Sequence, residues 1–122
     1  MMDTKKKDTR QINLDHLYDL ASGDKDFIRE MIEYYLSQVP VIGENLLKYQ
    51  AQKNWVELGE VAHKAKSSFK FMGIQLLTDD AKELEDICRE QANENRIKYL
   101  IQNIEKIMTS SANELKEELS KL

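Results

Sequence analysis

The stretch that decides the fold runs from Trp55 to Gly73 and reads WVELGEVAHKAKSSFKFMG. Its apolar and small residues recur at alternating spacings of three and four, which places them along one side of an α-helix. These residues are Trp55, Leu58, Ala62, Ala65, Phe69 and Met72. The stretch therefore predicts an amphipathic helix with one buried stripe.

A single histidine, His63, lies off this stripe and is expected to point toward solvent. Lys66, Ser67 and Lys70 follow it on the same exposed face, and Gly59 precedes it by one helical turn. The small neighbours leave room for a bulky group to approach. A neutral imidazole is a good nucleophile, and a phosphoryl group transferred to it would bring about two negative charges that a nearby ammonium partly neutralises. The pattern predicts a phosphoryl acceptor.

The order of these residues also matches a family signature, which is approximately His, any residue, Leu, Lys, Gly, with a second Gly ten residues after the histidine. His63, Lys66 and Gly73 match it in register, whereas Ala65 replaces the leucine and Ser67 replaces the first glycine. Ala65 belongs to the buried stripe and mainly alters packing, but Ser67 borders the histidine and alters how closely a partner approaches. In these residues the chain resembles the histidine-containing phosphotransfer (HPt) domain of multistep two-component phosphorelays.

The resemblance implies a phosphocarrier that is not an enzyme in its own right. His63 would accept a phosphoryl group from an aspartate of a response-regulator receiver domain and pass it to the aspartate of another receiver. Lys66 would stabilise the phosphate, with Ser67 and Lys70 in support, and Gly59 and Gly73 would be structural positions. No cofactor is expected in this chain, because Mg²⁺ would belong to the partner receiver. The implied partners are receiver domains, free or within a hybrid histidine kinase.

Three other interpretations stay open at this point. An exposed histidine on a helix is most often an ordinary surface residue. The departure at Ser67 is compatible with a helical adaptor that binds a receiver domain without being phosphorylated. A third possibility is a substrate domain that a histidine kinase core phosphorylates directly from ATP.

The rest of the chain predicts further helices with short connections. The apolar phase between residues 24 and 51 continues past Pro40, so we expect one helix bent at the proline rather than two. Asn13, Asp24 and Asn54 are the expected N-terminal caps of the first three helices, the last with a capping box to Glu57. The expected helices cover approximately residues 13–21, 24–51, 54–73, 74–92 and 96–122.

Amphipathic helices with short turns bury one another best in a bundle. The 122 residues include only four glycines and one proline, which favours helices over a sheet. The expected fold is all-α, an antiparallel up-down four-helix bundle with a short additional N-terminal helix. Residues 1–11 are expected to be a disordered lead, and residues 12–122 a single HPt-like domain.

Several classes of function are disfavoured. The formal net charge of -4 argues against nucleic-acid binding. No apolar run reaches the roughly 20 residues that cross a bilayer, and the start has no apolar signal core, so we expect no membrane association and a cytoplasmic location. Glycine-rich phosphate loops are missing from the sequence. Glu60 and His63 form one ExxH pair, but the neighbouring lysines disfavour a metal.

Cys88 is expected to be a buried thiol. The chain is expected to be a monomer, with His63 open to a partner.

Overall fold

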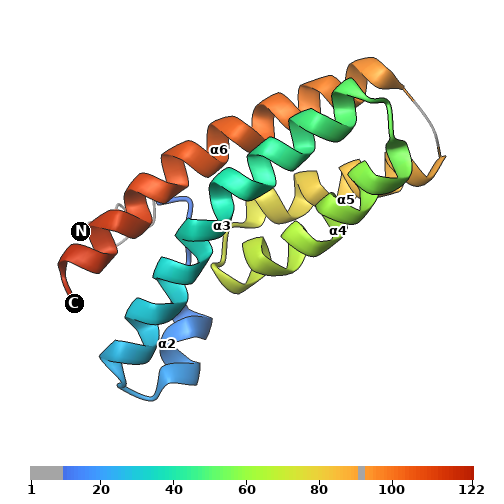
Figure 1. Ribbon diagram of the computed structural model, residues 1–122. Coiled ribbons are helices and arrows are strands. Elements are labelled where there is room, and N and C mark those ends of the chain that lie inside the picture. The colour runs from blue at the N-terminus through green and yellow to red at the C-terminus, as the bar shows by residue number, and fades with distance from the viewer. Residues whose placement is uncertain (1–9, 91–92) are drawn as a thin grey trace, which may run out of the picture.

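The computed structural model describes residues 10–90 and 93–122, and the helix labels used here are those of Figure 1. Within these residues the chain forms five helices and no strand. The helices are α2 (Asp15–Ala21), α3 (Lys25–Ala51), α4 (Trp55–Phe71), α5 (Gln75–Glu90) and α6 (Glu94–Ser120). The predicted all-α class is confirmed.

The four longer helices form a closed ring of contacts. α3 packs against α4 and α6, and α5 packs against the same two helices from the opposite side. Because the connections between successive helices are short, neighbours in the chain run antiparallel. α2 lies beside the first part of α3, beyond the ends of α4 and α5 (Figure 1). The predicted four-helix bundle with a short N-terminal helix is confirmed.

The predicted continuity of the helix through Pro40 is also confirmed. α3 extends without interruption over 27 residues with this proline inside it. Ile28, Ile32, Tyr35 and Leu46 of the expected apolar phase are buried, and the intervening residues of the phase are partly buried. Pro40 itself is exposed, so the pyrrolidine ring faces solvent and packing against α4 and α6 holds the helix together on both sides of it.

Two of the expected N-terminal caps are present. Asp24 accepts a hydrogen bond from the backbone N–H of Phe27 at 3.1 Å, and Asn54 accepts one from that of Glu57 at 3.2 Å. The expected capping box is only half formed. The backbone N–H of Asn54 donates to the carbonyl oxygen of Tyr49 at 3.0 Å, so it does not need the Glu57 carboxylate.

The first helix begins differently from the prediction. Asn13 accepts a hydrogen bond from the backbone N–H of Asp15 at 3.0 Å, but the residue at the N-cap position is Leu14. The expected N-cap, Asn13, therefore lies one residue before the N-cap of the structure. Its side chain instead forms a turn just before α2, as short polar side chains often do. α2 ends at Ala21, as expected, and the next two residues, Ser22 and Gly23, have positive φ.

The segment before α2 is held against α6. The backbone N–H groups of Gln11 and Ile12 donate to one carboxylate oxygen of Glu114, at 2.8 and 3.2 Å, and Arg10 pairs with Glu118 at 3.0 Å. Most of the predicted N-terminal lead, residues 1–9, lies outside the described residues. Arg10 and Gln11, which were expected to belong to the disordered lead, are held against α6.

The α4 stripe lies in the core as expected. Leu58, Ala62, Ala65, Phe69 and Met72 are buried and Trp55 is partly buried against them. The Phe69 ring meets that of Tyr35 edge-on, with centroids 6.4 Å apart, which joins α4 to α3. In the described part of the chain, no helix combines the length and the apolar character that a bilayer-spanning segment needs.

Candidate functional site

His63 lies in the middle of α4, on the side of the helix that faces α5. Its side chain is 57% exposed, which confirms the expectation that the imidazole meets solvent. Ala62 and Ala65 next to it are buried, so the backbone beneath the histidine is fixed by packing against the core. One edge of the ring is free for an incoming group, and the other is directed toward α5.

The group on α5 that holds this ring is Glu85. Nδ1 of His63 lies 2.8 Å from Oε2 of Glu85. Glu85 is only 7% exposed, which makes it one of two buried polar residues in the described part of the chain, together with Ser111. The carboxylate thus holds the imidazole from the α5 side, through Nδ1.

Glu85 was not predicted from the sequence. A signal was present, because Ala81, Glu85 and Cys88 are spaced by four and three and so place a carboxylate in the buried phase of α5. A buried carboxylate normally needs partners, and this one finds them on α4.

Glu85 is ionised at neutral pH. The hydrogen bond from Lys66 is the main reason that its pKa falls from 4.5 to about 2; burial opposes this change, and the bond with His63 adds to it. An ionised carboxylate can only accept hydrogen bonds. Nδ1 of His63 must therefore carry a proton and donate it to Glu85. In the neutral imidazole this leaves the lone pair on Nε2, the nitrogen that points away from α5.

Two cations share the same carboxylate. Nζ of Lys66 donates to Oε1 of Glu85 at 2.9 Å, and Nη2 of Arg89 donates to Oε2 at 2.9 Å. Lys66 is mostly buried, with 28% of its side chain exposed, whereas Arg89 is largely exposed on α5. His63, Lys66, Glu85 and Arg89 form a single network, which we call the Glu85 network.

The other predicted site residues on α4 lie outside this network. Ser67 and Lys70 are both exposed, one and two turns after His63. Ser67 lines a shallow, mainly apolar groove between α3 and α4 together with Met31, Tyr34 and Phe71. The structure thus brings His63 and Lys66 together through Glu85 and leaves Ser67 and Lys70 on the surface beside them. Their roles toward a phosphate stay predictions.

Gly59 lies where α4 packs directly against α5. A Cβ atom at this position would lie 3.3 Å from Cβ of Cys88. Gly59 also lines a small pocket between the two helices, together with Trp55 and Glu85. The glycine therefore lets the two helices approach closely enough for Glu85 to reach His63. The spacing of the sequence indicated an open surface here but not this contact.

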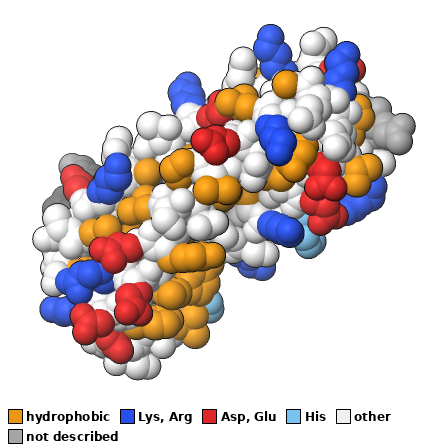
Figure 2. Space-filling view, viewed as in Figure 1, with side chains coloured by type: hydrophobic (Ala, Val, Ile, Leu, Met, Phe, Trp, Pro, Cys, Tyr) orange, Lys and Arg blue, Asp and Glu red, His pale blue; other side chains and the backbone are white. Residues whose placement is uncertain are grey.

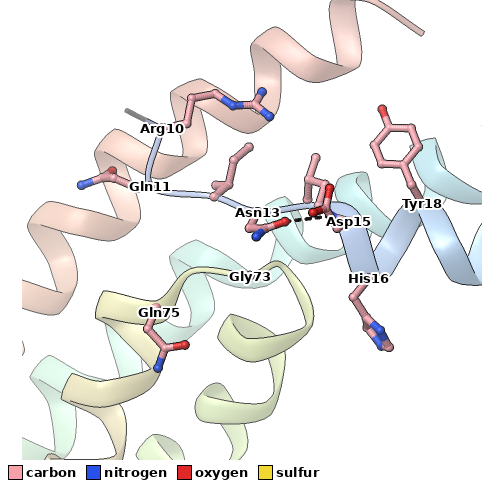
Figure 3. A pocket seen from close by; sticks show the side chains of 10 residues that line it. Arg10, Gln11, Asn13, Asp15, His16, Tyr18, Gly73 and Gln75 are labelled. Carbon is pink, nitrogen blue, oxygen red and sulfur yellow. Dashed lines mark hydrogen bonds between the residues drawn. The ribbon is translucent and has the colours of Figure 1, made fainter. Parts of the chain in front are cut away.

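Gly73 lies far from the histidine, in the turn between α4 and α5. Its φ is +66°, and a Cβ atom there would lie only 1.9 Å from the carbonyl oxygen of Asn13. Figure 3 shows this turn facing the segment that leads from Arg10 to α2. Gly73 is thus a structural residue that allows the N-terminal segment to cross the end of α4.

Cys88 is buried, as expected, and burial raises the pKa of its thiol to about 11. In residues 10–90 and 93–122 no group of three or more His, Cys, Asp or Glu side chains is arranged to hold a metal ion.

The surface beside the histidine combines apolar and charged side chains. Figure 2 shows hydrophobic side chains along α3 and near α2, and charged side chains of both signs near α4 and at the end formed by α2 and the start of α3. Tyr34 and Val41 are exposed apolar residues of α3. They line a second groove along α4 with Val61 and Lys64. A partner that reaches His63 would meet both an apolar strip and a set of ammonium groups.

Comparisons with known proteins agree with this geometry. The family model described as "Hpt domain" matches residues 30–122, from the first turns of α3 to the end of the chain. A solved structure with the same fold is the HPT domain from a Hpt sensor hybrid histidine kinase of Shewanella, with a TM-score of 0.78 and 19% sequence identity. The alignment covers 92% of this chain and 96% of that one. No curated protein sequence matches the chain.

The match extends over most of the chain and includes every residue of the Glu85 network. The resemblance seen in the spacing of His63, Lys66 and Gly73 is therefore confirmed by the family model and by the fold. The chain belongs to the Hpt domain family, the phosphotransfer intermediates of two-component phosphorelays.

Proposed function

We propose that the chain carries a phosphoryl group on Nε2 of His63. The observation that supports this most directly is the 2.8 Å contact between Nδ1 and the ionised Glu85 carboxylate. It fixes the proton on Nδ1 and turns the lone pair of Nε2 toward solvent. Nε2 therefore has its lone pair available for attack before any partner binds.

The transfer step needs no base from this chain. The Nε2 lone pair attacks the phosphorus of an aspartyl phosphate, the phosphorus–oxygen bond to the aspartate breaks, and its electron pair leaves with the aspartate carboxylate. The proton stays on Nδ1, so the ring acquires positive charge and Glu85, 2.8 Å away, stabilises it. Passing the phosphoryl group to a second receiver is the same step in reverse.

The remaining predicted residues serve the phosphoryl oxygens in this proposal. Lys66 follows His63 by three positions, so its ammonium lies within reach of a group on Nε2. Ser67 would donate a hydrogen bond from its hydroxyl, and Lys70 would add positive potential from the next turn. These roles rest on the spacing of the three residues from His63 along α4.

The partner supplies the rest of the chemistry. A receiver domain, free or part of a hybrid kinase, would bring the phosphoaspartate and its Mg²⁺, so the chain is a carrier and not a turnover enzyme. The proposal includes action in the cytoplasm as a monomer. The exposed imidazole between apolar and cationic side chains supports docking of such a partner.

The test is phosphoryl transfer to the full chain from a receiver domain charged with acetyl phosphate, followed by intact mass. The expected product is a single phosphate that is lost in acid and stable in base. His63→Gln should abolish it. The matched control is His16→Gln, because His16 is also exposed but lies on α2, and this variant should accept phosphate normally.

Other outcomes separate the alternatives. Phosphate on the His63→Gln variant, or none on the wild type with several charged receivers, overturns the proposal. Stable binding to a receiver without transfer would then favour the adaptor. Phosphorylation by a histidine kinase core and ATP, without exchange with any receiver, would favour a kinase substrate domain.

A further inference from the structure

Arg89 is a member of the Glu85 network that the proposed transfer step does not use. It follows Glu85 by one turn of α5 and donates from Nη2 to Oε2 at 2.9 Å, the same oxygen that accepts from His63. Its second nitrogen, Nη1, lies 3.7 Å from Oδ1 of Asp86. The two ring nitrogens of an imidazole point in divergent directions, so Arg89 lies on the Nδ1 side of the ring, away from the reacting nitrogen.

Phosphorylation of His63 adds a second anionic group beside the Glu85 network. Before transfer, Lys66 and Arg89 both pair with Glu85. After transfer, about two negative charges lie on the phosphoryl oxygens at Nε2. Lys66 follows His63 by one turn of α4, and its flexible four-carbon stem lets its ammonium turn from one anion to another. If Lys66 moved to the phosphoryl group, Glu85 would lose one of its hydrogen-bond partners. Glu85 is only 7% exposed, and a buried charge without partners is strongly unfavourable.

Arg89 is placed to prevent that loss. Residues four apart on a helix are neighbours, so the guanidinium stays beside Glu85 whatever Lys66 does. A guanidinium also keeps its charge under all ordinary conditions and binds a carboxylate in a fixed geometry. We propose that Arg89 is a positioning residue: it holds Glu85 in place on Nδ1 while Lys66 moves from Glu85 to the phosphoryl group on His63. This inference rests on the proposed function of His63.

The experiment measures phosphorylation by phosphoramidate, a small donor that avoids any effect on receiver docking. The N–P bond of the donor breaks, ammonia leaves, and a new N–P bond forms at Nε2. The variants are Arg89→Gln, Arg89→Lys and the matched control Arg96→Gln. Arg96 also binds a glutamate, Glu83, at 2.6 Å, but belongs to α6.

Arg89→Gln is expected to lower the rate about 5-fold, because Lys66 then stays on Glu85. Arg89→Lys should restore the rate to within about 2-fold, and Arg96→Gln should leave it unchanged. In the ¹⁵N–¹H spectrum of the unphosphorylated Arg89→Gln variant, His63 should keep its proton on Nδ1, since Lys66 still pairs with Glu85. That readout separates the proposed role from a general loss of structure.

A double-mutant cycle with Lys66→Gln tests whether Arg89 holds Glu85 when the lysine is absent. Each single variant keeps one cation on the carboxylate and should keep the proton on Nδ1 of His63. The double variant removes both cations, so the Nδ1 proton signal should be lost. A double variant that keeps this signal would show that Arg89 is not needed to hold Glu85 and would overturn the inference.

Two further results would also overturn it. One is loss of the Nδ1 proton in the unphosphorylated Arg89→Gln variant, and the other is a rate equal to that of Arg96→Gln. In both cases normal phosphorylation of the wild type would leave the proposed function of His63 intact. A wild type that takes no phosphate at His63 would overturn both.

Discussion

Replacing Glu85 by glutamine removes one negative charge from the contact between α4 and α5 and preserves the shape of the side chain. In the folded chain the carboxylate accepts hydrogen bonds from His63, Lys66 and Arg89. The bond from Lys66, supported by that from His63, lowers its pKa from 4.5 to about 2. Because the folded state has the lower pKa, the ionised carboxylate stabilises the fold at neutral pH. This contribution is present above pH 4.5 and is lost as the pH falls toward 2.

The size of the effect follows from that difference. At about 1.4 kcal/mol for each pKa unit, the lowered pKa corresponds to about 3 kcal/mol of unfolding free energy at pH 7. Solvent screens part of this, because the side chains of His63 and Arg89 are 57% and 68% exposed. After that discount we expect Glu85→Gln to lower the stability by about 1–2 kcal/mol. For a domain of this size the melting temperature would fall by about 4–8 °C.

The assay is urea unfolding of the wild type and Glu85→Gln at a series of pH values between 7 and 2. The matched control is Glu30→Gln, which removes a glutamate charge from the exposed surface of α3. The difference between wild type and Glu85→Gln should shrink as the pH falls from about 4.5 toward 2. A difference that stays constant with pH, or that equals the control at pH 7, would refute the assignment of Glu85 as the ionised centre of the network.

Three further predictions concern the scaffold. Gly73→Ala should lower the free energy of unfolding by about 3 kcal/mol or more, because the new Cβ meets the Asn13 backbone. Gly23→Ala places its Cβ in open space and should lower it by only about 1 kcal/mol. Urea unfolding of the two variants measures the difference. Pro40→Ala should raise stability by about 1–3 kcal/mol in the same assay, since it restores a hydrogen bond inside α3. Cys88 should react with a thiol reagent at least about 100-fold more slowly in the native chain than in urea, because burial raises its pKa to about 11.

Each of these has a result that contradicts it. Equal losses for Gly73→Ala and Gly23→Ala would mean that the crossing of the N-terminal segment over the turn is wrong. A destabilised Pro40→Ala variant would mean that the proline is accommodated by something other than an uninterrupted helix. Rapid modification of native Cys88 would contradict its burial between α4 and α5.

The helices were predictable because their signals are local. The apolar phase on both sides of Pro40 was enough to predict one helix, and Asp24 and Asn54 were recognised as caps from residues within one turn. The exposure of His63 followed from the same reasoning, since the buried stripe of α4 leaves it only the opposite side. Periodicity identifies which side of a helix is buried, and in a bundle that nearly determines the fold.

The partners of His63 were not predictable in the same way. Glu85 lies 22 residues away on another helix, and its contact depends on how closely α4 approaches α5 at Gly59. The phase of one helix carries no information about that distance. For the same reason the sequence showed Lys66 as a cation beside the histidine but not its pairing with Glu85.

The N-terminal segment shows the same limit. The sequence up to Gln11 is polar and unpatterned. The backbone N–H groups of Gln11 and Ile12 nevertheless donate to the carboxylate of Glu114, which is more than 100 residues away in the sequence. Gly73 was recognised from its register with the histidine, although its physical role is to let Asn13 pass. A match to a family signature indicates that a residue matters without saying why.

The central claim is that Glu85 directs the phosphoryl group to one particular nitrogen of His63. The most direct measurement is a long-range ¹⁵N–¹H spectrum with ³¹P coupling, recorded on the chain after transfer from a charged receiver domain. We predict phosphorus coupled to Nε2 of His63, with the proton still on Nδ1. Phosphorus on Nδ1, on His16 or on any other residue would contradict the account.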